Sequence, residues 1–315
     1  KASISEAFFY IFIWMLKIAY NQNYIYPLEE NHRFPMIKYE LIPEQLIREN
    51  TCSSENFFSP TKIDSKIVLK THQREYFERF TSLKLSKKEI REIGFPLSQE
   101  LVERELQIAE GTIKGVKYSI KNGISMNIAG GTHHAFYDRG EAFCMLNDQA
   151  IATNYIIQEG LFKKILIIDL DVHQGNGTAS LFNSNPNVYT LSFHGKKNYP
   201  FRKEKSDLDM EFDDNTNDDE YLKVLRETIP KVIDQFEPEF IFYLSGVDVL
   251  ENDKLGRLSL SIDGCKERDR FILEICKNNS IPVQVSMGGG YSVILKNIIE
   301  AHSNTFRLAQ EIFFW

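Results

Sequence analysis

The chain has 315 residues, of which 43% are hydrophobic, and its formal net charge at pH 7 is -7. This length and apolar content are sufficient for a large core. No Pro/Gly/Ser-rich linker, block of like charge or internal repeat divides the sequence, so we expect a single α/β domain. The acidic balance argues against direct nucleic-acid binding but would not repel a basic peptide.

Cysteine usage indicates the redox environment. The four cysteines lie far apart in the sequence, and no two of them form a C-x-x-C pair. This spacing favours neither a disulfide framework nor a thiolate zinc site, so a reducing cytoplasm fits best. The residues are Cys52, Cys144, Cys265 and Cys276.

An apolar run, FFYIFIWML from Phe8 to Leu16, precedes the first predicted strand. It is too short to span a membrane, and it lacks the basic start and small-residue cleavage site of a signal peptide. With Met15 as the natural start, LKIAY (Leu16 to Tyr20) is the first strand. Residues 1–14 would then be an upstream or artificially added extension, and the domain would cover residues 15–315.

Helices are predicted from Pro35 to about Glu49, after Thr71, and from residue 97 to 122. In the THQREYF segment we expect His72 and Glu75 to lie on a solvated helix face. The long helix has an amphipathic pattern. Its predicted apolar side contains Leu101, Leu106, Ile108, Ile113, Val116 and Ile120.

A strand predicted at residues 125–129 ends in the sequence GGTHH. Two glycines allow the backbone to pass close to a ligand, and the adjacent His133 and His134 are well placed for proton transfer. A buried histidine pair with a purely structural role is the alternative.

The most informative strand, Ile165 to Ile168, is apolar enough to be covered on both faces. Asp169, Asp171 and His173 follow at alternate positions, so an extended backbone would point them to one side. Carboxylate oxygens and imidazole nitrogen suit zinc or another divalent first-row ion. The alternative is a strand end whose aspartates cap the next helix.

Strands at residues 240–244 and 282–285 run into SGVD, which contains Asp248, and MGGGY, which contains Tyr291. Helical patterns at residues 147–158, 220–235, 266–278 and 292–314 alternate with the strands. This order predicts a single-domain, three-layer αβα fold with a mainly parallel sheet. Ligands of such sheets bind beyond the carboxyl ends of the strands, where all these polar residues should gather.

Five motifs occur in the order GGTHH, DRGEAFCMLND, DLDVHQGNG, SGVDVLENDKLG and MGGGY. Together they resemble the zinc-dependent histone deacetylase superfamily, which has an arginase-like α/β fold. The resemblance runs from about Leu16 to the end of the chain. HQGNG and the segments NHRFPMIKY and NYPFRKEKSDLD are most similar to class IV, the branch that includes bacterial homologues.

The resemblance implies one Zn²⁺ per chain, held by Asp171, His173 and Asp248. It also implies that His133 and His134 are the catalytic pair and that Tyr291 polarises the acyl carbonyl.

The two histidines should differ, because the resemblance places Asp169 behind His133 and Asn176 behind His134. Many class I enzymes have a second aspartate at the latter position. An amide cannot stabilise a positive charge as a carboxylate does, so we expect the lower pKa for His134.

The resemblance also implies a tunnel for acyl-lysine and a monovalent-cation site. Phe143 and Tyr199 match the aromatic tunnel walls, although their pattern alone also fits core packing, and Gly131 and Gly289 should let the backbone line the tunnel. Potassium would have a structural role. Its expected site comprises Asp169, Asp171, His173, Ser192 and Phe193.

We therefore expect a cytoplasmic zinc-dependent amidohydrolase without a membrane span, acting on acyl-lysine in a peptide or protein or on a small acylated amine. One alternative is an arginase-like ureohydrolase with two manganese ions. The other is a catalytically silent acyl-lysine-binding or scaffold protein. The sequence leaves the physiological substrate, the acyl-chain length and the oligomeric state open.

Overall fold

The structure is a computed structural model that describes residues 14–315. Its central sheet has eight strands in the order β2-β1-β3-β8-β7-β4-β5-β6, and all pairings are parallel. The strands are β1 (Lys17–Ala19), β2 (Phe57–Phe58), β3 (Ile124–Asn127), β4 (Ile165–Asp169), β5 (Val188–Gly195), β6 (Leu208–Phe212), β7 (Phe240–Leu244) and β8 (Val283–Ser286).

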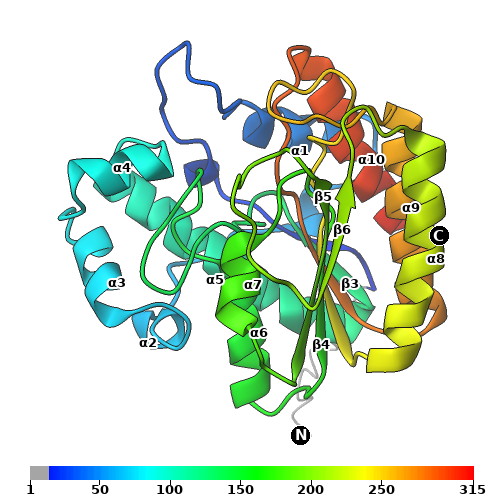
Figure 1. Ribbon diagram of the computed structural model, residues 1–315, viewed down its shortest axis with the longest axis horizontal. Helices are drawn as coiled ribbons and strands as arrows, with labels where there is room; N and C mark the ends of the chain where they lie inside the picture. The colour runs from blue at the N-terminus through cyan, green and yellow to red at the C-terminus, as the bar shows by residue number, and fades with distance from the viewer. Residues whose placement is uncertain (1–13) are drawn as a thin grey trace, which may run out of the picture.

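Helices cover both faces of this sheet, which confirms the predicted αβα fold. Figure 1 shows the sheet nearly edge-on, with α5, α6 and α7 on one side and α8 and α9 on the other, while α10 packs against α9 and α1. The helices are α1 (Lys38–Arg48), α2 (Ser65–Val68), α3 (Arg74–Thr81), α4 (Lys87–Ile93), α5 (Gln99–Asn122), α6 (Asp148–Gln158), α7 (Asn176–Phe182), α8 (Asp218–Phe236), α9 (Ile262–Asn278) and α10 (Leu295–Phe314).

The predicted strands are confirmed within two residues at each end, but three strands were not predicted. β4 and β7 are buried along their whole length, as their apolar sequences require. β2 has only two residues, and the edge strand β6 is partly exposed and carries Asp209 and Glu211. Such strands form because a neighbouring strand offers backbone partners, and a single segment does not reveal this.

Two helix predictions were wrong. His72 lies before α3 and is fully buried, whereas Glu75 is exposed as expected. The His72 Nδ1–H group donates to the Phe136 carbonyl (2.8 Å), and Nε2 accepts a hydrogen bond from the Asn147 amide (3.0 Å). In α5, Ile120 is 43% exposed, because the buried face of the helix continues from Val116 through Ser119 instead.

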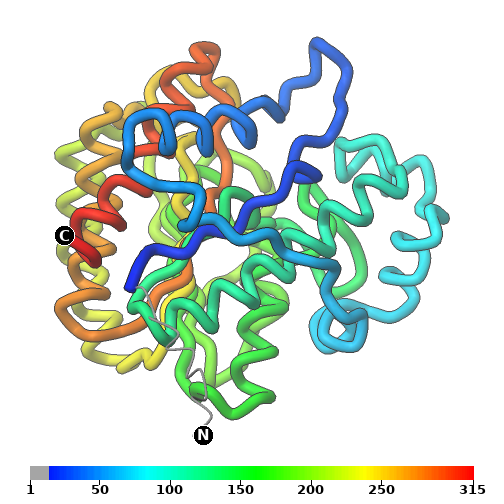
Figure 2. Tube along the Cα trace, turned by 180° about the vertical axis from the view of Figure 1, so that it is seen from behind, coloured from blue at the N-terminus to red at the C-terminus, as the bar shows by residue number. Residues whose placement is uncertain are grey.

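The segment containing α2, α3 and α4 lies to one side of the sheet, next to α5, in both views (Figures 1 and 2). The apolar run Phe8 to Leu16 lies mostly outside the described residues. Within residues 14–315, no helix combines the length and apolar character needed to cross a bilayer. The four cysteines are free and buried.

Four neighbouring strands, in the sheet order β3-β8-β7-β4, position the functional residues. Their ends are level, because Asn127 pairs with Ser286, Ser286 with Leu244, and Leu244 with Asp169. The segments that follow these strands therefore leave the sheet side by side, at the edge where parallel α/β proteins bind ligands.

Candidate metal centre

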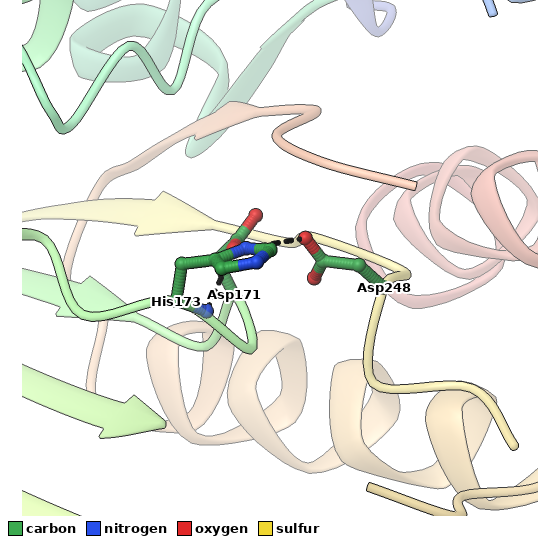
Figure 3. A group of neighbouring side chains, drawn as sticks. All are labelled: Asp171, His173 and Asp248. Carbon is green, nitrogen blue, oxygen red and sulfur yellow. Dashed lines mark hydrogen bonds and ion pairs between the residues drawn. The ribbon is translucent and has the colours of Figure 1, made fainter. Parts of the chain in front are cut away.

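Asp171, His173 and Asp248 form a buried cluster beyond the ends of β4 and β7 (Figure 3). His173 Nδ1 lies 3.0 Å from Asp171 Oδ1 and 3.1 Å from Asp248 Oδ2. One ligand atom from each residue lies within 4.8 Å of the others. Backbone amides fix the remaining oxygens, since Gly289 donates to Asp171 Oδ2 (2.9 Å) and Val172 to Asp248 Oδ1 (3.0 Å).

The electrostatics of this cluster favour a cation. Burial lowers the pKa of His173, but its hydrogen bonds to Asp171 and Asp248 outweigh burial and raise the pKa to about 10. Burial and the charge of Asp171 raise the pKa of Asp248 to about 7. The two buried carboxylates therefore favour a positive charge beside them. A divalent ion bound by two carboxylate oxygens and one imidazole nitrogen would supply that charge. The residues fit such an ion.

His133 and His134, in the segment after β3, each have a separate hydrogen-bond acceptor. The His133 Nδ1–H group donates to Asp169 Oδ2 and that of His134 to Asn176 Oδ1, both over 2.6 Å. The two ring centroids are 4.1 Å apart. Because both Nδ1 atoms are occupied, each Nε2 atom is left to exchange protons.

The two histidines differ in pKa. Burial lowers the pKa of His133, but the charges of Asp169 and Asp171 outweigh burial and leave it above its usual value. Burial and the positive charges on His133 and His173 hold the pKa of His134 well below its usual value. The difference has the direction expected from a carboxylate behind one ring and an amide behind the other.

Tyr291 follows β8 and faces the same site. Its ring centroid is 6.3 Å from that of His173, and within residues 14–315 its hydroxyl has no hydrogen-bond partner. The Tyr291 amide donates to Asp253 Oδ2 (2.6 Å), while Asp253 Oδ1 accepts from the Leu255 and Gly256 amides (2.8 and 2.9 Å). Asp253 therefore ties the Tyr291 backbone to a neighbouring turn, a role that the sequence analysis missed.

Lys38 is a second residue that the sequence analysis missed. It is fully buried, and its ammonium donates to the Gly288 carbonyl (3.1 Å) and lies 5.7 Å from the Tyr291 ring centroid. Burial lowers the pKa of Lys38 to about 8, although the charges of Asp248 and Asp171 oppose this shift. Helical spacing could have indicated that Lys38 is buried. Lys38 precedes the buried Ile42 by four residues in α1, so the two side chains lie on the same face of the helix.

Two connected cavities lead to the cluster. An inner cavity of about 40 Å³ is bordered by the paired histidines and by Gly131 and Gly289. An outer cavity of about 510 Å³ opens toward the surface, and His134, His173, Phe143 and Tyr291 border both. A Cβ atom at Gly289 would lie 2.2 Å from Asp248 Oδ2, so only glycine allows this close approach.

The predicted tunnel aromatics Phe143 and Tyr199 both border the outer cavity. The Phe143 ring lies 6.0 Å from the Tyr291 ring, and its backbone has a φ of 68°. The Tyr199 ring stands edge-on to His134 at 5.0 Å, and its hydroxyl donates to Glu141 Oε2 (2.6 Å). Phe143 also belongs to the hydrophobic core, so the core and tunnel interpretations both apply to it.

The predicted monovalent-cation residues lie together around β4 and β5. Asp169 pairs in register with Ser192, and the Ser192 hydroxyl is 2.9 Å from His194 Nδ1. All five residues are buried. The assignment of a cation to them stays a prediction.

Level strand ends, the acid-histidine cluster and the paired histidines define an α/β protein of the arginase and deacetylase fold. Residues 29–306 match the histone deacetylase domain. The chain therefore belongs to the histone deacetylase family, and its class of activity is deacetylase-type hydrolysis.

Known relatives extend over nearly the whole chain. An uncharacterised protein of Picosynechococcus sp. is 38% identical over 296 residues, which cover 94% of this chain and 99% of that protein. Histone deacetylase 2 of Arabidopsis thaliana is 27% identical over 91% of this chain and 77% of that protein. The crystal structure of an HDAC homologue from Aquifex aeolicus has a TM-score of 0.79 at 22% identity, covering 94% and 83% of the two chains, and it shares the fold.

Proposed function

We propose that this protein is a zinc-dependent hydrolase that removes an acyl group from acyl-lysine or a similar acylated amine. The observation that carries this proposal is that the buried cluster of Asp171, His173 and Asp248 adjoins a cavity. Asp171 and His173 border this cavity together with the paired histidines and Tyr291, whose hydroxyl has no partner among residues 14–315. Each component has the chemistry that amide hydrolysis requires.

Asp171, His173 and Asp248 would hold the zinc ion. When bound, zinc supplies a Lewis acid for the acyl carbonyl and lowers the pKa of a water molecule to about 7. Three protein ligands are typical of catalytic rather than structural zinc sites, because they leave room for water and substrate.

The paired histidines would move the proton. His134, with an amide behind it, starts neutral, accepts a proton at Nε2 from the attacking water and gives it to the leaving amine. His133, with Asp169 behind it, is the more readily protonated of the two and assists electrostatically. Amide cleavage needs the final proton transfer because an unprotonated amine leaves poorly.

The Tyr291 hydroxyl would donate a hydrogen bond to the oxyanion that develops from the acyl carbonyl. It needs no other partner to be displaced first, and Asp253 holds its backbone in place. Phe143 and Tyr199 would enclose the aliphatic stem of the lysine, and Gly131 and Gly289 would line the inner part of the tunnel.

We further assign the chain to class IV, on the basis of the HQGNG, NHRFPMIKY and NYPFRKEKSDLD segments. We infer a structural potassium ion beside Asp169 and Ser192. Four free, buried cysteines support a reducing, cytoplasmic location.

Two alternatives are less well supported. A ureohydrolase with two manganese ions would need more ligands, and within residues 14–315 no second cluster of three or more His, Cys, Asp or Glu side chains is suited to a metal. A silent acyl-lysine-binding protein would have no need for the complete set of proton-transfer and oxyanion residues.

A screen of lysine peptides bearing acyl groups from acetyl to myristoyl tests the proposal. We expect hydrolysis that a zinc chelator abolishes and added zinc restores. Short acyl groups should react fastest, because the inner cavity is only about 40 Å³. No hydrolysis of any peptide by fully zinc-loaded protein would contradict the proposal and favour the binding-protein alternative.

A further inference from the structure

The mouth of the outer cavity is rich in positive charge. Arg33, Lys197, Lys254 and Arg257 border it, together with a single acidic residue, Glu92. All four cationic side chains are exposed. The chain as a whole has the opposite balance, with 44 acidic and 37 basic residues, so this concentration is a local feature of the site.

The neighbouring acids offset little of this charge. Lys197 Nζ and Arg257 Nη1 share one oxygen of Asp214, at 3.4 and 3.1 Å. Glu92 is paired with Lys88 outside the cavity lining, at 3.7 Å. One carboxylate, that of Asp214, is therefore shared by two of the four cationic side chains.

The other two cations are held near the tunnel without an acidic partner. Among residues 14–315, no carboxylate oxygen lies within 4.0 Å of a side-chain nitrogen of Arg33 or Lys254. The Arg33 guanidinium is 5.2 Å from the ring centroid of Phe143, in the tunnel wall. Lys254 lies within the turn that Asp253 ties to Tyr291, so its backbone is fixed beside the site.

We propose that this cationic mouth, consisting of Arg33, Lys197, Lys254 and Arg257, selects acyl-lysine in acidic peptide sequences. The inference rests on the proposed function, because the neutral acyl-lysine side chain must enter between Phe143 and Tyr199. The peptide backbone and the flanking residues then remain at the mouth, beside the four cations. A cleft lined by one sign of charge concentrates ligands of the opposite sign and excludes like-charged ones.

The test uses zinc-loaded full-length protein and three acetyl-lysine peptides of equal length, flanked by acidic, neutral or basic residues. We expect kcat/KM to be highest for the acidic peptide and about tenfold or more lower for the basic one at low salt. The ratio should fall as the salt concentration rises, because the mouth is exposed to solvent. Maximal rates should differ less than KM, since these charges do not touch the reacting bond.

The variant Arg33→Gln/Lys254→Gln should remove most of the preference while leaving kcat on the neutral peptide unchanged. Lys231→Gln is the matched control. Lys231 is also exposed, but it lies near the end of α8 that precedes β7, at the opposite edge of the sheet. This control should retain the full preference.

The outcomes separate the inference from the proposed function. Equal kcat/KM for the three peptides, a preference for the basic one, or an unchanged preference in the double variant would overturn the inference alone. Failure of the zinc-loaded protein to hydrolyse any of the peptides would overturn the proposed function and the inference with it.

Discussion

His72 should make the folding stability depend on pH in a way that one substitution can isolate. Burial lowers the pKa of His72 from 6.5 to about 4, although its hydrogen bond to the Phe136 carbonyl opposes the shift. Nε2 faces the Asn147 amide, which already donates to it, so a second proton has no place there. The folded protein therefore keeps this ring neutral, with its proton on Nδ1.

The direction and size of the effect follow from these pKa values. Between pH 6.5 and about 4 the unfolded chain binds a proton at His72 that the folded protein does not bind. The contribution of His72 to stability is therefore complete above pH 6.5 and is lost as the pH falls toward 4. The stability lost amounts to about 2 kcal/mol at pH 5 and about 3.4 kcal/mol in the acid limit.

The assay is urea unfolding of the wild type and of His72→Gln at pH 8, 7, 6 and 5. Glutamine cannot titrate, and its amide can still offer one donor and one acceptor. The wild type should lose about 2 kcal/mol more than the variant between pH 8 and pH 5, because other titrating groups cancel in the difference. A difference between the two proteins that does not change with pH would refute this account of His72.

Three further predictions concern the site itself. Tyr291→Phe should lower kcat by about a hundredfold or more with little change in zinc content or KM, because the hydrogen bond to the oxyanion is lost; steady-state kinetics with near-normal kcat would exclude the proposed role. Asp248→Ala should empty the metal site while the fold largely persists, as elemental analysis and circular dichroism can show, and stoichiometric zinc in this variant would contradict the ligand assignment. Asn176→Asp should raise the pKa of His134 and move the acid limb of the kcat/KM profile to higher pH by about one unit; an unmoved limb would show that His134 is not the proton acceptor.

The sequence was informative where one strand and its following segment carry the chemistry. Buried apolar runs such as Ile165 to Ile168 are local features, and the acids and histidines next to them share one sheet edge whatever the strand order. The order itself is not local. That β8 and β7 lie between β3 and β4 depends on pairing between distant segments, which no single stretch of sequence specifies.

The supporting residues were missed for the same reason. Lys38 belongs to α1 but contacts Gly288, 250 positions away, and Asp253 accepts from the Tyr291 amide, 38 positions away. Four separate segments contribute Arg33, Glu92, Lys197 and Lys254 to the outer cavity. Neither composition nor periodicity reports such contacts, because they exist only once the sheet has formed.

The order of the strands also determines when the site can form during synthesis. The ribosome releases β3 and β4 early, whereas β7 and β8, which lie between them in the sheet, are the last strands made. β4 has an unpaired edge until β7 has emerged at residue 244, and β3 has one until β8 has emerged at residue 286. Such unpaired edges are a hazard for aggregation. Asp248 follows β7, so between residues 173 and 248 the nascent chain has only part of the Asp171, His173 and Asp248 cluster. The complete cluster therefore exists only after β7 has been made, and any metal bound there would be captured late in synthesis.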